Sequence, residues 1–63
     1  MAEKLLLYYK YIYDVKGFTG KIDLAKETKI PSTEAAIESD TLEKLQLFKD
    51  AILKITGKPA PNL

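Results

Sequence analysis

The absence of both cysteine and histidine constrains the fold of this chain more than any other feature of its sequence. Domains of roughly 60 residues bury only about 60% of their unfolded surface, and many rely on a disulfide, a metal ion or a partner chain. No disulfide can form here, and tetrahedral zinc lacks its usual ligands. The 63-residue chain must therefore be stabilised by apolar packing or by association, and we expect no cofactor and no metal.

The positive charge of the chain is carried entirely by lysine. Ten Lys balance nine Asp and Glu, and there is no Arg. Because Arg is the side chain that forms paired hydrogen bonds with phosphate and guanine, the chain lacks the commonest base-specific DNA contact. The longest apolar run, LLLYY at residues 5–9, is far shorter than the roughly 20 residues that span a bilayer. We expect a cytoplasmic protein without a membrane partner.

The first segment, residues 2–16, combines two periodicities. Its apolar residues fall at helical spacing, and Ala, Leu, Glu and Lys at its start favour a helix; the expected core stripe is Leu5, Tyr8, Tyr9, Ile12 and Val15. Alternating tyrosines allow a strand instead, which would form a hairpin of residues 8–15 and 21–25 around a glycine loop. The length without a turn signal favours a helix over about 3–16, ended by Gly17. Phe18 is expected to pack beneath the loop that follows.

The rest of the chain predicts two short helices and one long helix. Residues 19–29 form the first, and Pro31 ends it. Ser32 or Thr33 begins a second that runs to about Ser39. Asp40 occupies the capping position before a helix over 41–56, which Gly57 ends. The apolar stripe of this long helix is Leu42, Leu45, Phe48, Ile52 and Ile55.

The predicted fold is therefore all-α. We expect a compact bundle of three to four helices in one domain, residues 1–57, with the long helices at about 3–16 and 41–56 packed together. The proline-containing tail, residues 58–63, is expected to be disordered.

Residues 22–39 resemble the helix-turn-helix motif in part. Leu24-Ala25, Ile30 and Ser32-Thr33 match its small and apolar positions and the start of its second helix. The resemblance implies a second helix that reads the major groove. It gives an alternative function, DNA binding through Lys26, Lys29, Ser32 and Thr33.

The same stretch departs from that motif in three ways. Lys29 takes the turn position usually given to glycine, where a positive φ is required. Ala35 stands where a larger apolar anchor is expected. Residues 31–43 contain four acidic residues and no Lys, which opposes entry into a groove lined by phosphates. Residues 22–39 are therefore better explained as two packing helices than as a DNA-binding helix-turn-helix.

No pattern predicts catalysis. The commonest general base and the thiol nucleophile are both missing. Glu34 and Glu38 share one face of the short predicted helix, where a solvated acidic surface is the expected role. We therefore expect a protein that is not an enzyme.

Apolar residues outside the predicted core stripes indicate a binding surface. Leu7 and Tyr11 lie among the polar residues of the first helix, and Leu47 among those of the last. The lysine-rich residues 16–29 also precede the acidic residues 34–43, and such a split can complement itself across a two-fold axis. We predict a small non-enzymatic protein-protein interaction module or accessory subunit that self-associates as a homodimer, with Leu7, Tyr11 and Leu47 at the contact.

Overall fold

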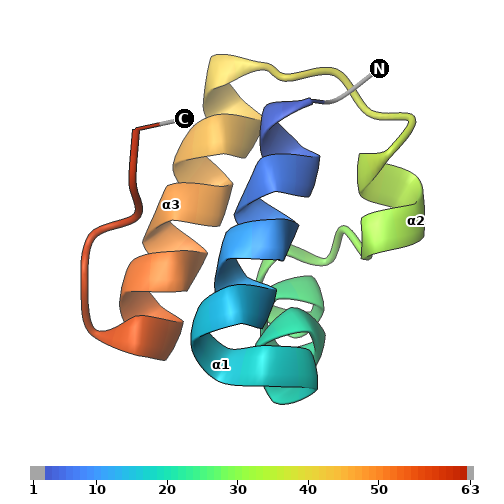
Figure 1. Ribbon diagram of the computed structural model, residues 1–63. Coiled ribbons are helices and arrows are strands. Elements are labelled where there is room, and N and C mark those ends of the chain that lie inside the picture. Colours follow the sequence, from blue (N-terminus) through green and yellow to red (C-terminus); the bar gives the residue numbers. More distant parts are fainter. Residues whose placement is uncertain (1–2, 63) are drawn as a thin grey trace.

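The computed structural model describes residues 3–62 and folds them into three helices (Figure 1). These are α1 (Lys4–Thr28), α2 (Ser32–Ala35) and α3 (Leu42–Thr56). The described residues include no strand, and α1 packs against both other helices. The predicted all-α fold with two long packed helices is confirmed, and the alternative hairpin of residues 8–15 and 21–25 is wrong because both segments are helical.

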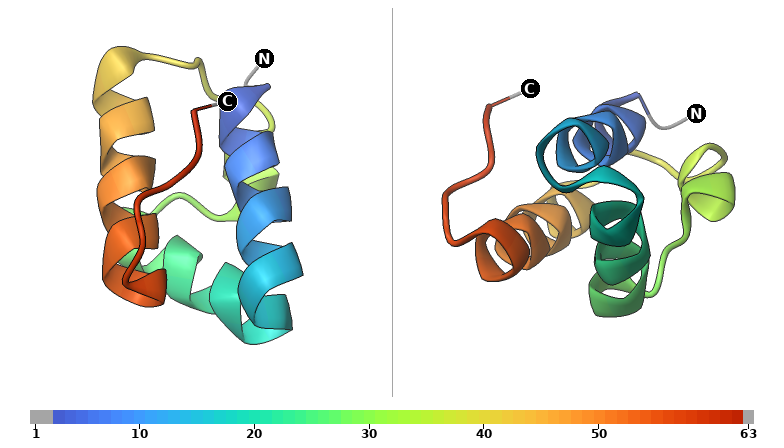
Figure 2. Two further views of the ribbon diagram at one scale, coloured as in Figure 1. Left: turned by 60° about the vertical axis from the view of Figure 1, so that its left-hand side comes forward. Right: turned by 60° about the horizontal axis from the view of Figure 1, so that its bottom comes forward.

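Gly17 divides α1 into two arms, a first arm of residues 4–16 and a second arm of residues 18–28. Its φ of 71° and ψ of −156° are values that essentially only glycine adopts. The chain therefore changes direction sharply between the arms (Figure 2). The predicted stop at Gly17 is confirmed. Phe18, however, is 67% exposed and does not pack beneath the loop.

The second arm ends at Thr28 because Lys29 takes the left-handed conformation, with a φ of 61°. The N–H of Lys29 donates to the Ala25 carbonyl at 2.8 Å. The buried Thr28 hydroxyl donates to the Leu24 carbonyl at 2.7 Å and accepts from the N–H of Ile30 at 3.3 Å. These bonds satisfy the last turn and direct the chain toward Pro31.

The helix after Pro31 is shorter than predicted. α2 ends at Ala35 rather than near Ser39, and the chain continues through turns to Asp40. This path allows the Asp40 carboxylate to reach the start of α1. There it accepts hydrogen bonds from the backbone N–H groups of Glu3, Lys4 and Leu5 at 3.0, 3.1 and 3.3 Å.

Asp40 thus caps α1, although the sequence predicts it as the cap of the following helix. That role belongs to Thr41, whose hydroxyl accepts from the N–H of Lys44 at 3.2 Å. Asp40 can cap α1 because the first N–H groups of that helix have no partner within the helix itself. A carboxylate placed there also interacts favourably with the helix dipole.

The core lies between the first arm of α1, the second arm and α3. Phe48 packs against two tyrosine rings, with centroid distances of 6.3 Å to Tyr8 and 5.6 Å to Tyr9. The buried apolar residues are Leu5, Tyr8, Tyr9, Ile12, Leu24, Ala35, Phe48, Ala51 and Ile52. The predicted stripes are confirmed at their centres, but Val15 and Leu42, at the ends of their helical segments, are exposed.

The tail after Gly57 lies beside the core. Ala60 packs against the buried cluster, and the Tyr8 hydroxyl donates to the Pro61 carbonyl at 3.4 Å. Residues 58–62 form neither helix nor strand. The predicted disorder of residues 58–63 stays a prediction, and its last residue lies outside the described part of the chain.

Acid should weaken the Asp40 cap. Partial burial acts to raise the pKa of Asp40, but the three N–H donors and the charge of Lys4 together lower that pKa from its ordinary 3.8. The stabilisation is therefore complete above pH 3.8 and is lost as the pH falls through the lower value in the folded protein. We expect Asp40→Asn to reduce the free energy of unfolding by about 1 kcal/mol at neutral pH. Urea unfolding at several pH values should show this difference disappearing in acid.

A matched control for this experiment is Asp14→Asn, which changes an exposed aspartate within the first arm. Its effect on the free energy of unfolding should be small at neutral pH, because Asp14 lies far from the start of α1. A difference between the wild-type chain and Asp40→Asn that persists unchanged in acid would contradict the role assigned to Asp40.

Candidate protein-interaction surface

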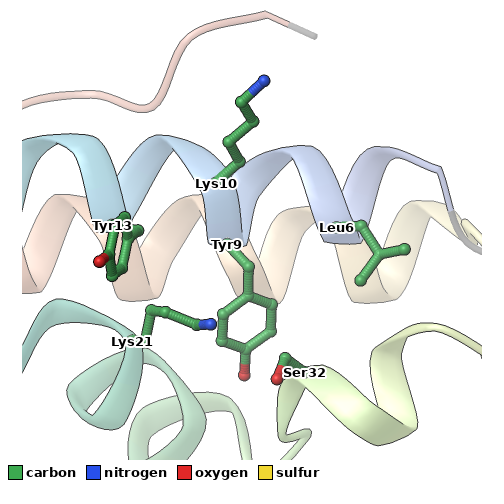
Figure 3. A pocket seen from close by; sticks show the side chains of 6 residues that line it. All are labelled: Leu6, Tyr9, Lys10, Tyr13, Lys21 and Ser32. Carbon is green, nitrogen blue, oxygen red and sulfur yellow. The ribbon is translucent and has the colours of Figure 1, made fainter. Parts of the chain in front are cut away.

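Two adjoining hollows lie between the arms of α1 and the start of α2, and Figure 3 shows the residues that line the first of them. Their volumes are about 330 and 190 Å³. They share three lining residues, Tyr9, Lys21 and Ser32, and so form one continuous surface, which we name the α1–α2 groove. Its lining residues are Leu6, Tyr9, Lys10, Tyr13, Phe18, Lys21, Ile22, Ala25, Pro31 and Ser32.

Each wall of the groove follows from local sequence. On the first arm, Leu6, Lys10 and Tyr13 recur at intervals of four and three residues, so they share one flank of the helix. The bend at Gly17 brings the second arm beside this flank. Ser32, which follows Pro31, lies on the opposite wall from the first arm (Figure 3).

Tyr9 forms the floor of the groove and is almost completely buried. Its hydroxyl donates to the carbonyl of Ile30, which connects the floor to the chain segment before α2. Burial raises the pKa of Tyr9 above its ordinary 10.0, against a smaller lowering by the Thr28 hydroxyl. The Tyr9 hydroxyl therefore remains protonated at neutral pH and keeps this donor bond.

The rim of the groove is apolar and exposed. Leu6, Tyr13, Phe18 and Ile22 belong to the large apolar side chains that the fold leaves open to solvent. Single exposed apolar residues are ordinary, but a contiguous group of them is typical of a binding surface. The sequence does not predict this surface, because Phe18 is expected in the core. The spacing of Leu6, Lys10 and Tyr13 was the available signal.

The charges that line the groove are of one sign. Its lining residues include two lysines, Lys10 and Lys21, and no Asp or Glu. Figure 3 shows the Lys21 side chain pointing toward Tyr9 and the Lys10 side chain leading away from it. The Lys21 ammonium lies 5.6 Å from the ring centroid of Tyr13, within the range of a cation–π interaction. The groove therefore presents apolar surface together with positive charge.

The structure places the predicted contact residues apart from this groove. Leu7 is exposed on the first arm, and Tyr11 is half-buried against the core. Leu47 lines two further hollows, one with Glu27, Asp50, Ala51 and Lys54 and the other with Ile30, Glu43 and Lys44. Neither hollow includes Leu7 or Tyr11, so the structure does not unite the three residues in one hollow. Their shared role stays a prediction.

The residues of the alternative DNA-binding prediction also lie at the surface. Lys26, Lys29 and Thr33 are exposed, while Ser32 is half-buried in the groove wall. Lys29 does adopt the left-handed turn conformation that the motif requires. The helix that should enter the major groove is, however, the single turn of α2. DNA binding therefore stays a prediction to which the fold adds no support.

Residues 3–62 contain no group of three or more Asp or Glu side chains arranged to hold a metal ion. No helix within these residues has the length and apolar content needed to cross a membrane. Comparison of the chain with protein-family models, curated proteins and solved structures gave no match.

Proposed function

We propose that this protein is a small non-enzymatic interaction module or accessory subunit that binds a protein through the α1–α2 groove. The observation that supports the proposal most directly is the exposed apolar rim formed by Leu6, Tyr13, Phe18 and Ile22. Burying a fully exposed side chain of this kind is worth about 1.5–3 kcal/mol before the entropic cost of association. These four side chains are 40–67% exposed, so a partner that covers them gains about half of that value from each.

The groove also has the rigidity that a binding site needs. Its floor is fixed by the bond from Tyr9 to the Ile30 carbonyl and by the contact of Tyr9 with Phe48. Two of its rim residues, Tyr13 and Phe18, are aromatic, and aromatic side chains contribute strongly to protein interfaces. A partner therefore meets a preformed surface and orders few new groups on binding.

A pair of matched variants tests the proposal. Ile22 and Leu47 are both branched aliphatic residues on helices, with exposed fractions of 41% and 40%, but only Ile22 lines the α1–α2 groove. Ile22→Asp is expected to reduce binding at least tenfold, a change of about 1.4 kcal/mol, because it places a carboxylate in the apolar rim. Leu47→Asp should leave binding unchanged.

The measurement is capture by tagged protein from an extract of the cells that encode it, with an untagged second copy added, and quantification by mass spectrometry. Circular dichroism shows whether each variant keeps its helices. Loss of binding with Leu47→Asp but not with Ile22→Asp would reject the groove and support the surface predicted from Leu7, Tyr11 and Leu47. If both variants capture as much protein as the wild-type chain does, both surfaces are rejected.

A further inference from the structure

We propose that the α1–α2 groove binds the acidic turn, residues 34–38, of a second copy of this chain, forming a two-fold symmetric dimer. This inference rests on the proposed function, because it identifies the occupant of the same groove. The acidic turn carries the exposed Ile37 between the carboxylates of Glu34 and Glu38.

The acidic turn projects an unsupported apolar side chain. Ile37 is 79% exposed, yet its backbone is held firmly. The N–H groups of Ile37 and Glu38 both donate to the Glu34 carbonyl at 3.1 Å, and the Glu38 carboxylate forms an ion pair with Lys44. A large aliphatic side chain is thus presented on a defined turn, which is the form that an anchor for an apolar groove takes.

The charges of the groove and of the acidic turn are complementary. Lys21 lines both hollows and points toward Tyr9 at the floor of the groove, whereas the Lys10 side chain leads away from Tyr9 (Figure 3). The lining residues include no Asp or Glu.

The acidic turn carries two carboxylates, Glu34 and Glu38, and no lysine. Glu38 is paired with Lys44, so Glu34 is the carboxylate of the turn that forms no ion pair within the described residues. Opposite charges around an apolar contact favour this pairing and disfavour contact between two grooves or between two acidic turns.

The position of α2 makes a reciprocal contact possible. Ser32, the first residue of α2, lines the groove, and Ile37 follows only five positions later. Groove and acidic turn are therefore neighbours on each copy, and Figure 3 shows Ser32, at the start of α2, beside the floor of the groove. A two-fold axis that passes between them brings each acidic turn to the groove of the other copy. Such an interface closes on itself and forms a dimer rather than a filament.

Charge reversal with complementation tests this arrangement. Lys21→Glu makes the groove less positive, and Glu34→Lys makes the turn less negative. Each change occurs twice in a symmetric dimer, so each variant alone should have a dimer dissociation constant raised about tenfold, or about 1.4 kcal/mol. An equimolar mixture should restore dimerisation, since the mixed dimer again pairs opposite charges at the sites of both changes.

Two variants with the same changes of charge serve as controls. Lys26→Glu alters an exposed lysine of the second arm that does not line the groove. Glu43→Lys, like Glu34→Lys, alters a glutamate in the first turn of a helix. Neither should change the dissociation constant measured by sedimentation equilibrium of the purified chain.

A dimer that both reversals leave intact, or that the mixture fails to restore, would overturn the proposed pairing. A purified chain that remains monomeric at the highest soluble concentration would overturn the second copy as occupant. If that monomer still captures a different protein in a manner that requires Ile22, the proposed function stands and only its partner changes. If it captures nothing, both proposals fail.

Discussion

Replacing Phe48 with alanine is expected to reduce the free energy of unfolding by about 3–5 kcal/mol. Phe48 is fully buried and contacts Tyr8 and Tyr9, so its ring joins α3 to the first arm of α1. At about 0.05–0.15 kcal/mol per residue, a domain of this length has a total stability of roughly 3–9 kcal/mol. The substitution therefore removes a large part of that stability, and a substantial fraction of the variant should be unfolded at room temperature.

Circular dichroism during urea unfolding measures this effect. Leu53→Ala is the matched control, because Leu53 lies on the same helix but is exposed. Its free energy of unfolding should stay within about 1 kcal/mol of the wild-type value, since it loses little buried area. A cooperative transition of Phe48→Ala with nearly wild-type stability would show that α3 is held to α1 by other contacts.

The helices were predictable from the sequence because their signals are local. Apolar spacing identified the first arm and α3, and Gly17 and Gly57 marked the ends of these two helical segments. The core residues near the middle of each segment followed from the same spacing. The errors at Val15 and Leu42 lie near the ends, where a neighbouring helix no longer covers the stripe.

The Asp40 cap shows why other features were not predictable. Its carboxylate binds N–H groups that lie 35–37 residues away in the sequence. A local rule assigns Asp40 to the helix that follows it, and no periodicity reveals the competing partner. The early end of α2 accompanies this contact, because the turns after Ala35 carry the chain to the position from which Asp40 reaches α1.

The α1–α2 groove likewise depends on how two segments are placed relative to each other. Helical periodicity predicts that Leu6 and Tyr13 share one flank of the first arm. It does not predict that the second arm lies beside that flank. The placement depends on the backbone conformation of Gly17 and on the close approach at Gly20. The spacing of apolar residues predicts neither the backbone conformation of Gly17 nor the close approach at Gly20, although both glycines are present in the sequence.

Replacing Gly20 with alanine is therefore expected to destabilise the fold by about 1–3 kcal/mol. A Cβ atom at Gly20 would lie 2.5 Å from the Cβ of Lys16 and 2.9 Å from the carbonyl oxygen of Ile12. The backbone oxygen cannot move aside without shifting the first arm. This steric cost should exceed the gain of about 1 kcal/mol that alanine normally brings to a helix.

Thr19→Ala is the matched control, because Thr19 is the exposed neighbour of Gly20 in the same arm. Its effect on the free energy of unfolding should stay within about 0.5 kcal/mol. Because Gly20→Ala forces the arms apart, it should also weaken binding at the α1–α2 groove, which Thr19→Ala should not do. If Gly20→Ala instead raises the stability measured by urea unfolding, the arms do not approach as closely as the structure shows. The width of the groove between them would then be different as well.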